Sequence, residues 1–173
     1  MQFATAFIAV SALVAGVAAD YATVKTDVLR IQTDVAKLYQ ALKTTSGTSY
    51  SEALAIDSAS KTLVKDINTA NTDAKAVASV TSTQANALIS ILSKTYVNVT
   101  GASQRLITLE PAFKKLGVAG IAKTDVNNVA NATKVFGATL VSKAPAASKS
   151  SASALAAKYN KALASAVAAY ASD

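Results

Sequence analysis

The sequence predicts an all-α protein, an antiparallel bundle of about five amphipathic helices. Two observations lead to this fold class. Apolar residues recur at steps of three and four along most of the chain, which places them on one face of a helix. No stretch alternates apolar and polar residues for long enough to form a convincing strand. Most of the predicted helices have ~20 residues and are therefore expected to be ~30 Å long.

The first helix is predicted over residues 21–43. Asp27 and Asp34 lie off its apolar stripe, and Gly47 is the expected turn residue after the helix. The stripe itself has steps of 4, 3, 4, 3 and 4 residues and comprises Val24, Val28, Ile31, Val35, Leu38 and Leu42.

The second helix is predicted to begin at Ser49, because Glu52 three residues later has the spacing of a capping box. Asp66 and Asp73 share one face of this helix, and we expect them to be solvated surface residues. The apolar stripe comprises Ile56, Leu63, Ile67, Ala70, Ala74 and Val77.

The third helix starts with a similar capping signal from Thr81 to Gln84. Pro111 is expected to disturb or end this helix, and a short piece then closes at Gly117. The fourth helix is predicted over residues 120–143 and is stopped by Pro145. The stripes of these two helices comprise Leu88, Leu92, Thr95, Val99 and Leu106, and then Val126, Val129, Thr133, Phe136 and Leu140.

The fifth helix, predicted over residues 151–171, has a thin apolar face. Most of that face is alanine, and alanine buries little area. The larger residues on it are Leu155, Tyr159, Leu163, Val167 and Tyr170. Such a face fits either close helix packing or a helix that leaves room beside it. Residues 145–151 are a connector or the first turn of this helix.

Residues 1–19 have the pattern of a secretory signal peptide cut before Asp20. They contain no charged side chain, an apolar run from Phe3 to Val14 and the small residues Val17, Ala18 and Ala19. The alternative is a membrane anchor, but a spanning helix needs ~20 apolar residues. Residues 20–173 are then a single helical-bundle domain, long enough to bury roughly two-thirds of its surface.

The composition excludes several kinds of chemistry. The chain has no histidine and no cysteine, so it offers no imidazole base, no thiol nucleophile and no metal site built on either residue. Ser58 and Lys61 match the letters of a Ser-x-x-Lys motif, but so short a match is common by chance. We find no carboxylate pair on an apolar stripe. The sequence therefore predicts a protein that is not an enzyme and that has no metal or cofactor.

The net charge of +7 is spread over isolated basic residues, with Lys114 and Lys115 as the only adjacent pair. Nucleic-acid binding requires a denser basic surface, so we predict no nucleic-acid partner.

Small polar residues interrupt the apolar stripes at Ser60, Thr95 and Thr133. A hydroxyl in a dry core is costly unless it finds a partner. That partner is either a backbone carbonyl one turn back in the same helix or the polar head of an enclosed amphipath. The sequence leaves both alternatives open.

The chain resembles the fungal hydrophobic surface-binding protein A-like family, which includes the lipid-binding domains of cell-wall galactomannoproteins. The matching features are "FKKLGV", the spacing Leu140-x-x-Lys143-x-Pro145, and the Ala-rich ending "AVAAYAS". The resemblance implies a secreted or cell-wall-associated helical bundle. Relatives adsorb to hydrophobic surfaces, some help to recruit hydrolases there, and others enclose a long-chain fatty acid between helices. The chain ends without a hydrophobic tail, so no lipid-anchor signal is expected.

We therefore predict a secreted protein that binds a long-chain fatty acid or another amphipathic lipid in a cavity, adsorbs to hydrophobic surfaces, or does both. The alternative is a passive structural or antigenic wall mannoprotein with a solid core. Cell-wall polysaccharide and a secreted hydrolase are further candidate partners.

The predicted cavity lining is Ile31, Val35, Leu38, Ile56, Ser60, Leu63, Ile67, Leu88, Leu92, Thr95, Val129, Thr133, Phe136, Leu140, Leu155, Tyr159 and Leu163. Asn98 and Asn131 begin sequons and are candidate N-glycosylation sites.

Overall fold

A computed structural model describes residues 19–173 and contains five α-helices over that range. Almost all of the signal peptide predicted over residues 1–19 lies outside the described residues. The helices are α1 (Tyr21–Thr44), α2 (Tyr50–Ala76), α3 (Ser82–Leu116), α4 (Ala119–Lys143) and α5 (Ala146–Ala169). The predicted all-α fold class is confirmed. The segment after Pro145 proves to be the first turns of α5 rather than a connector.

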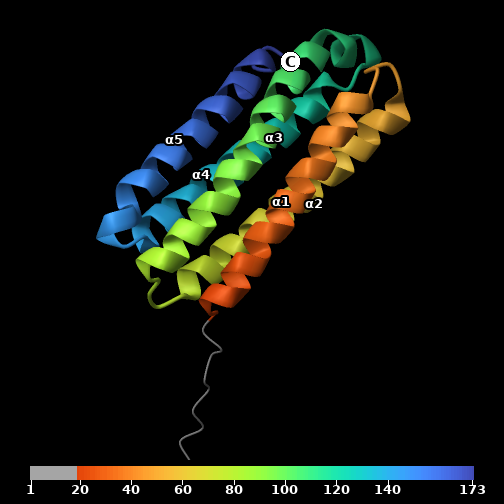
Figure 1. Ribbon diagram of the computed structural model, residues 1–173. Coiled ribbons are helices and arrows are strands. Elements are labelled where there is room, and N and C mark those ends of the chain that lie inside the picture. Colours follow the sequence, from red (N-terminus) through yellow and green to blue (C-terminus); the bar gives the residue numbers. More distant parts are fainter. Residues whose placement is uncertain (1–18) are drawn as a thin grey trace, which may run out of the picture.

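The five helices form a ring around a central space. Going round the ring, α1 packs on α2, α2 on α4, α4 on α5, α5 on α3, and α3 again on α1. Consecutive helices run in opposite directions (Figure 1), so the neighbours α2 and α4 run parallel to one another. Across the ring, α3 and α4 touch only weakly. Because most packing is between ring neighbours, the middle of the bundle need not be filled.

Side-chain caps fix the starts of α1, α2 and α3, whereas α4 and α5 begin without a side-chain cap from any described residue. The Asp20 carboxylate accepts a hydrogen bond from the Thr23 backbone N–H at 2.8 Å, which lowers the pKa of Asp20. The Thr81–Gln84 capping box is complete in both directions, as predicted. The predicted box at Ser49 is only half formed: its hydroxyl caps the Glu52 N–H, but the Glu52 carboxylate accepts from the Thr45 hydroxyl at 2.6 Å instead.

The prediction that Pro111 interrupts the third helix is wrong. Helix α3 continues through Pro111 to Leu116 and ends at Gly117, whose φ is +79°. Proline costs a helix one backbone hydrogen bond, but here tertiary packing outweighs that loss. Leu109 and Phe113, on either side of Pro111, are each only 2% exposed.

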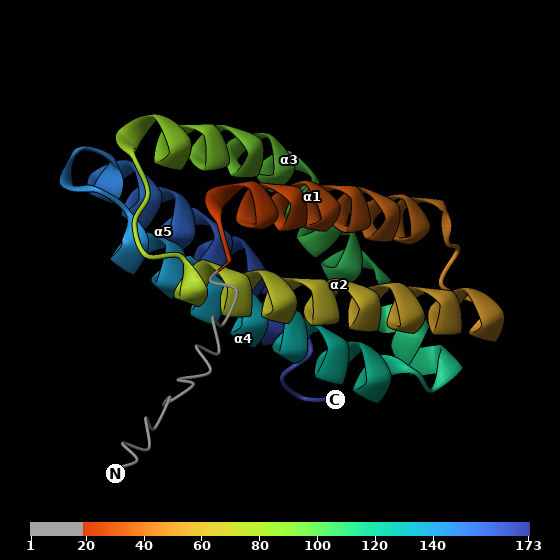
Figure 2. The ribbon, with the colours of Figure 1, turned by 90° about the horizontal axis from the view of Figure 1, so that it is seen from below.

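Large side chains close one end of the bundle, where the α1–α2 and α3–α4 connections lie (Figure 2). We call this the closed end. It is a cluster built on Leu42, Ala53, Ile56, Leu109, Phe113, Val118, Ala119, Ala122 and Tyr170. Tyr170 is fully buried, and its hydroxyl donates to the Leu106 carbonyl at 2.8 Å. The Arg105 guanidinium donates to the carbonyls of Leu42 and Thr45, at 3.0 and 2.7 Å, and so ties α3 to the end of α1.

The interface between α1 and α2 contradicts the expectation for its acidic residues. Asp27 and Asp34 of α1 are buried, and they face Asp73 and Asp66 of α2 respectively. Burial, followed by the neighbouring carboxyl, raises the pKa of both Asp27 and Asp34. Asp66 and Asp73 are thus half-buried partners in two carboxyl pairs rather than solvated surface residues. The equal spacing of seven residues in both helices brings both pairs into register.

Candidate ligand-binding cavity

The ring encloses an elongated, mostly apolar cavity. The volume of this cavity, defined as the space that the centre of a water molecule can occupy, is about 170 Å³. A single water needs only about 10–15 Å³ on the same measure. All five helices contribute lining residues, from Ile31 to Leu42 on α1 and from Ala85 to Leu106 on α3. The α3 segment alone spans ~30 Å at 1.5 Å per residue. A cavity of this length argues against a solid core.

The structure places every predicted lining residue except Thr95 at this cavity. Thr95 is 1% exposed, and its hydroxyl donates to the Ile91 carbonyl one turn back at 3.0 Å. For Thr95 the backbone carbonyl is therefore the partner. Ser60 and Thr133 do line the cavity. Contact between any of these side chains and a ligand stays a prediction.

Sequence reasoning missed several lining residues that carry polar groups. They are Ser103 on α3, and Asp125 and Lys143 on α4. Two of them could have been found from helical spacing, because Ser103 lies four residues after Val99 and Lys143 lies three after Leu140. Asp125 precedes the stripe residue Val126, and no pattern in the sequence distinguishes it from a surface acid.

The thin face of α5 forms one wall of the cavity. Ala152, Ala156 and Ala166 line it together with Leu155, Tyr159 and Leu163. The Tyr159 ring lies 5.4 Å from the Tyr96 ring, centroid to centroid, and its hydroxyl donates to the Leu92 carbonyl at 2.7 Å. Burial raises the pKa of Tyr159, so the hydroxyl stays neutral and hydrogen-bonded. The alanines thus leave space beside α5 while Tyr159 anchors the helix to α3.

Asp125 is the acidic group of the lining. It is 9% exposed and lies toward the closed end, beside Asp57 and Lys61 of α2. Burial, with the Asp57 charge as a smaller cause, raises the pKa of Asp125 to about 7, while Lys61 opposes the shift. The Lys61 ammonium is itself paired with the Asp57 carboxylate at 2.8 Å. Asp125 therefore changes charge near neutral pH.

The two candidate glycosylation sites lie on helices. Asn131 is exposed on α4, and Asn98 is half-buried on α3. The acceptor threonine of the Asn98 sequon, Thr100, donates to the Tyr96 carbonyl at 3.0 Å. Glycosylation at Asn98 and Asn131 stays a prediction.

Two further features bear on the kind of site. Within residues 19–173, no group of three or more acidic, histidine or cysteine side chains is placed to hold a metal ion. None of the helices described is long and apolar enough to cross a membrane. The fold and the site together define a helical-bundle protein whose interior is built to accept hydrophobic material.

A sequence profile of the Hydrophobic surface binding protein A family matches residues 21–142. The chain therefore belongs to this family, as its resemblance predicted. Among curated proteins, none matches the chain.

Solved structures show the same fold at low sequence identity. AFMP4P, solved in complex with palmitic acid, is 24% identical with a TM-score of 0.82; the match covers 87% of this chain and 99% of AFMP4P. Ligand binding domain 1 of the Penicillium marneffei MP1 protein, solved with arachidonic acids, is 16% identical with a TM-score of 0.80. That match covers 87% of this chain and 98% of the domain.

Proposed function

We propose that the protein binds one long-chain fatty acid in the central cavity and that this role is non-enzymatic. The observation that carries the proposal is the elongated apolar cavity enclosed by the five-helix ring. Apolar pockets with a few polar groups are the usual form of small-molecule sites. Family membership and the fatty acids bound by AFMP4P and the MP1 domain support the same assignment.

Native mass spectrometry of the protein incubated with palmitate tests the proposal. We expect a single adduct with the mass of palmitate. Leu92→Trp places a larger side chain on the cavity wall and should abolish the adduct while circular dichroism stays helical. Leu54→Trp is the matched control, because Leu54 is 43% exposed and does not line the cavity. Equal uptake by both variants, or no adduct with the wild type, contradicts the proposal.

A second function, adsorption to hydrophobic surfaces, is favoured by the family match. It requires the ring to open so that the apolar stripes can face a surface. A disulfide between α1 and α3, which pack together, should block opening if its Cα atoms are about 5.5–6 Å apart. Adsorption to a hydrophobic resin should then fall in the oxidised form and return on reduction. Equal adsorption by the oxidised and reduced forms would rule out the opening mechanism.

We further propose that the protein acts outside the cell or in the cell wall. Purification from the secretion medium, followed by solvent extraction and mass spectrometry, tests this location and identifies the natural ligand in one experiment. Cell-wall polysaccharide and a secreted hydrolase stay predicted partners.

A further inference from the structure

The two ends of the cavity carry different ionisable side chains. Of the described residues that line it, Lys143 alone is cationic and Asp125 alone is acidic. Both lie on α4, 18 residues apart, which corresponds to ~27 Å along the helix. Asp125 lies in the second turn of α4, toward the closed end, and Lys143 is the last residue of α4. The α2–α3 and α4–α5 connections lie together at that end of the bundle (Figure 2).

The Lys143 end is where the cavity reaches the bundle boundary. Val80 and Ala144 belong to the connecting segments there, and both line the cavity. A smaller pocket of about 20 Å³, which reaches Tyr21 and Val24 of α1, shares Lys143 with the main cavity. The opposite end is filled by the large side chains of the closed end. An entering chain therefore leaves its last atoms beside Lys143.

The Lys143 ammonium is held in position with donors to spare. It donates one hydrogen bond to the carbonyl of Val77, the residue that caps the end of α2, at 2.7 Å. An ammonium has three N–H donors, so two remain for another acceptor. The side chain is half-buried, and a charge-assisted hydrogen bond to a carboxylate is stronger there than in open water.

The described residues at the Asp125 end offer no free cation to a ligand carboxylate. Asp57 and Asp125 lie together there, and the Lys61 ammonium beside them is already paired with the Asp57 carboxylate at 2.8 Å. Ser60 and Ser103 also line the cavity and can donate hydrogen bonds, but neither offers a positive charge.

From these observations we propose that the cavity selects anionic amphipaths and holds them in one direction, with the carboxylate on Lys143 and the terminal methyl toward Asp125. This inference rests on the proposed function. It assigns Lys143 as the residue that distinguishes a fatty acid from an uncharged lipid of the same length.

The test compares the binding of palmitate and of hexadecanol, which has the same chain length without the charge. In the wild type we expect palmitate to bind more tightly. Lys143→Met should weaken palmitate binding by roughly 10–100-fold, the range for hydrogen bonds to charged groups, and leave hexadecanol binding unchanged. Lys143→Arg should preserve the preference for palmitate. Lys134→Met is the matched control and should also preserve it, because Lys134 is an exposed lysine of the same helix that does not line the cavity.

A preference for palmitate that survives in Lys143→Met, or that is lost in Lys134→Met instead, overturns the assignment of Lys143. Failure of the wild type to bind either lipid is a different result, because it rejects the proposed function itself.

A second measurement uses the wild type alone, so it does not depend on whether the variants fold. Palmitate spin-labelled near its methyl end should broaden the amide NMR signals of Ala122 and Asp125, and broadening at Lys143 and Ala144 instead contradicts the proposed direction.

Discussion

The closed end and the hollow centre are built by the same helices, yet one is filled and the other is not. At the closed end, α3 contributes Phe113, and Tyr170 directly follows the last residue of α5; each is at most 2% exposed. One to five turns earlier, α5 contributes Ala152, Ala156 and Ala166 to the cavity wall instead. The alanine side chains of α5 therefore help to leave the centre of the ring open.

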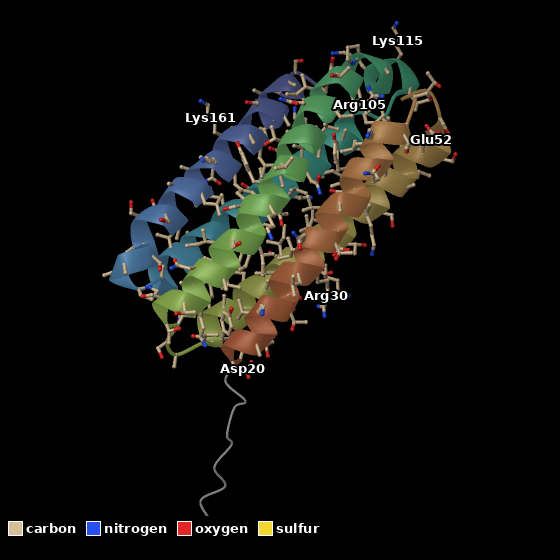
Figure 3. All side chains as sticks on the ribbon, in the orientation of Figure 1. Asp20, Arg30, Glu52, Arg105, Lys115 and Lys161 are labelled. Carbon is tan, nitrogen blue, oxygen red and sulfur yellow. The ribbon has the colours of Figure 1, made fainter. Side chains whose placement is uncertain are left out.

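The two regions also differ in the side-chain hydrogen bonds that join their helices. At the closed end, Arg105 binds two carbonyls at the end of α1, and the Lys123 ammonium donates to the Ala171 carbonyl at 2.8 Å. Figure 3 shows Arg105 and Lys115 in this part of the molecule, with Asp20 at the opposite end. Away from the closed end, the Tyr159 hydroxyl donates to the Leu92 carbonyl and the Ser148 hydroxyl donates to the Asn86 side chain, and both hydrogen bonds join α5 to α3.

The largest expected difference is in the cost of truncating an apolar side chain. Phe113→Ala creates a new cavity in the closed end and should lower the free energy of unfolding by about 3–5 kcal/mol. Leu92→Ala only enlarges an existing cavity and should cost about 1–2 kcal/mol. Urea unfolding of both variants provides the measurement. Equal costs would show that the centre is as tightly packed as the closed end.

The pH dependence of stability should sharpen the comparison, because Asp125 lies between the two regions. Its pKa is raised from 3.8 to about 7, so the folded protein binds more protons than the unfolded chain between these values. The free energy of unfolding is then greatest below about pH 4 and falls as pH rises through about 7. We expect a loss of roughly 1–3 kcal/mol from this group, measured by urea unfolding across that range.

Asp125→Asn provides the control for this prediction, because it removes the titrating group and should flatten the profile. The raised pKa values of Asp27 and Asp34 act in the same direction, so some slope should remain. A wild-type protein that becomes more stable from pH 4 to pH 7 contradicts the prediction.

Gly101 allows α1 to approach α3 beside the hollow centre. A Cβ atom there would lie 2.6 Å from Cζ of Tyr39, so Gly101→Ala must displace the tyrosine ring and should cost about 1–3 kcal/mol. Gly120→Ala is the matched control, because its Cβ would meet nothing within 4 Å. That variant should be neutral or more stable by about 0.5–1 kcal/mol. Thermal unfolding that ranks the two variants the other way would reject this account.

The smallest effect is expected at the link between the neighbouring helices α3 and α5 beside the hollow centre. Tyr159→Phe keeps the ring but removes the hydroxyl that donates to the Leu92 carbonyl. The expected cost is about 0.5–1.5 kcal/mol, typical of one neutral hydrogen bond. Amide hydrogen exchange should increase in the α5 residues around Tyr159 and stay unchanged around Tyr170, and an equal increase at both places contradicts the comparison.

Much of the fold could be predicted from the sequence, because helical periodicity is a local property. The stripe residues Ile31, Leu63 and Phe136 are buried where the spacing places them. Pro111 was misjudged because local propensity opposes a helix there while burial of Leu109 and Phe113 favours it. The carboxyl pairs were missed for a similar reason. The sequence gives the position of each aspartate on its own helix, but only the packing of α1 on α2 brings these side chains face to face.

The sequence by itself determined which residues share a helix face, since 3.6 residues per turn aligns them whatever their surroundings. It also determined that α5 presents mostly alanine. Only the tertiary structure decided that these faces meet around an open space, because closing five helices into a ring sets how far each face stands from the next. The tertiary structure likewise placed Lys143 and Asp125 at opposite ends of one cavity, since the charge of a site depends on neighbours that are distant in sequence.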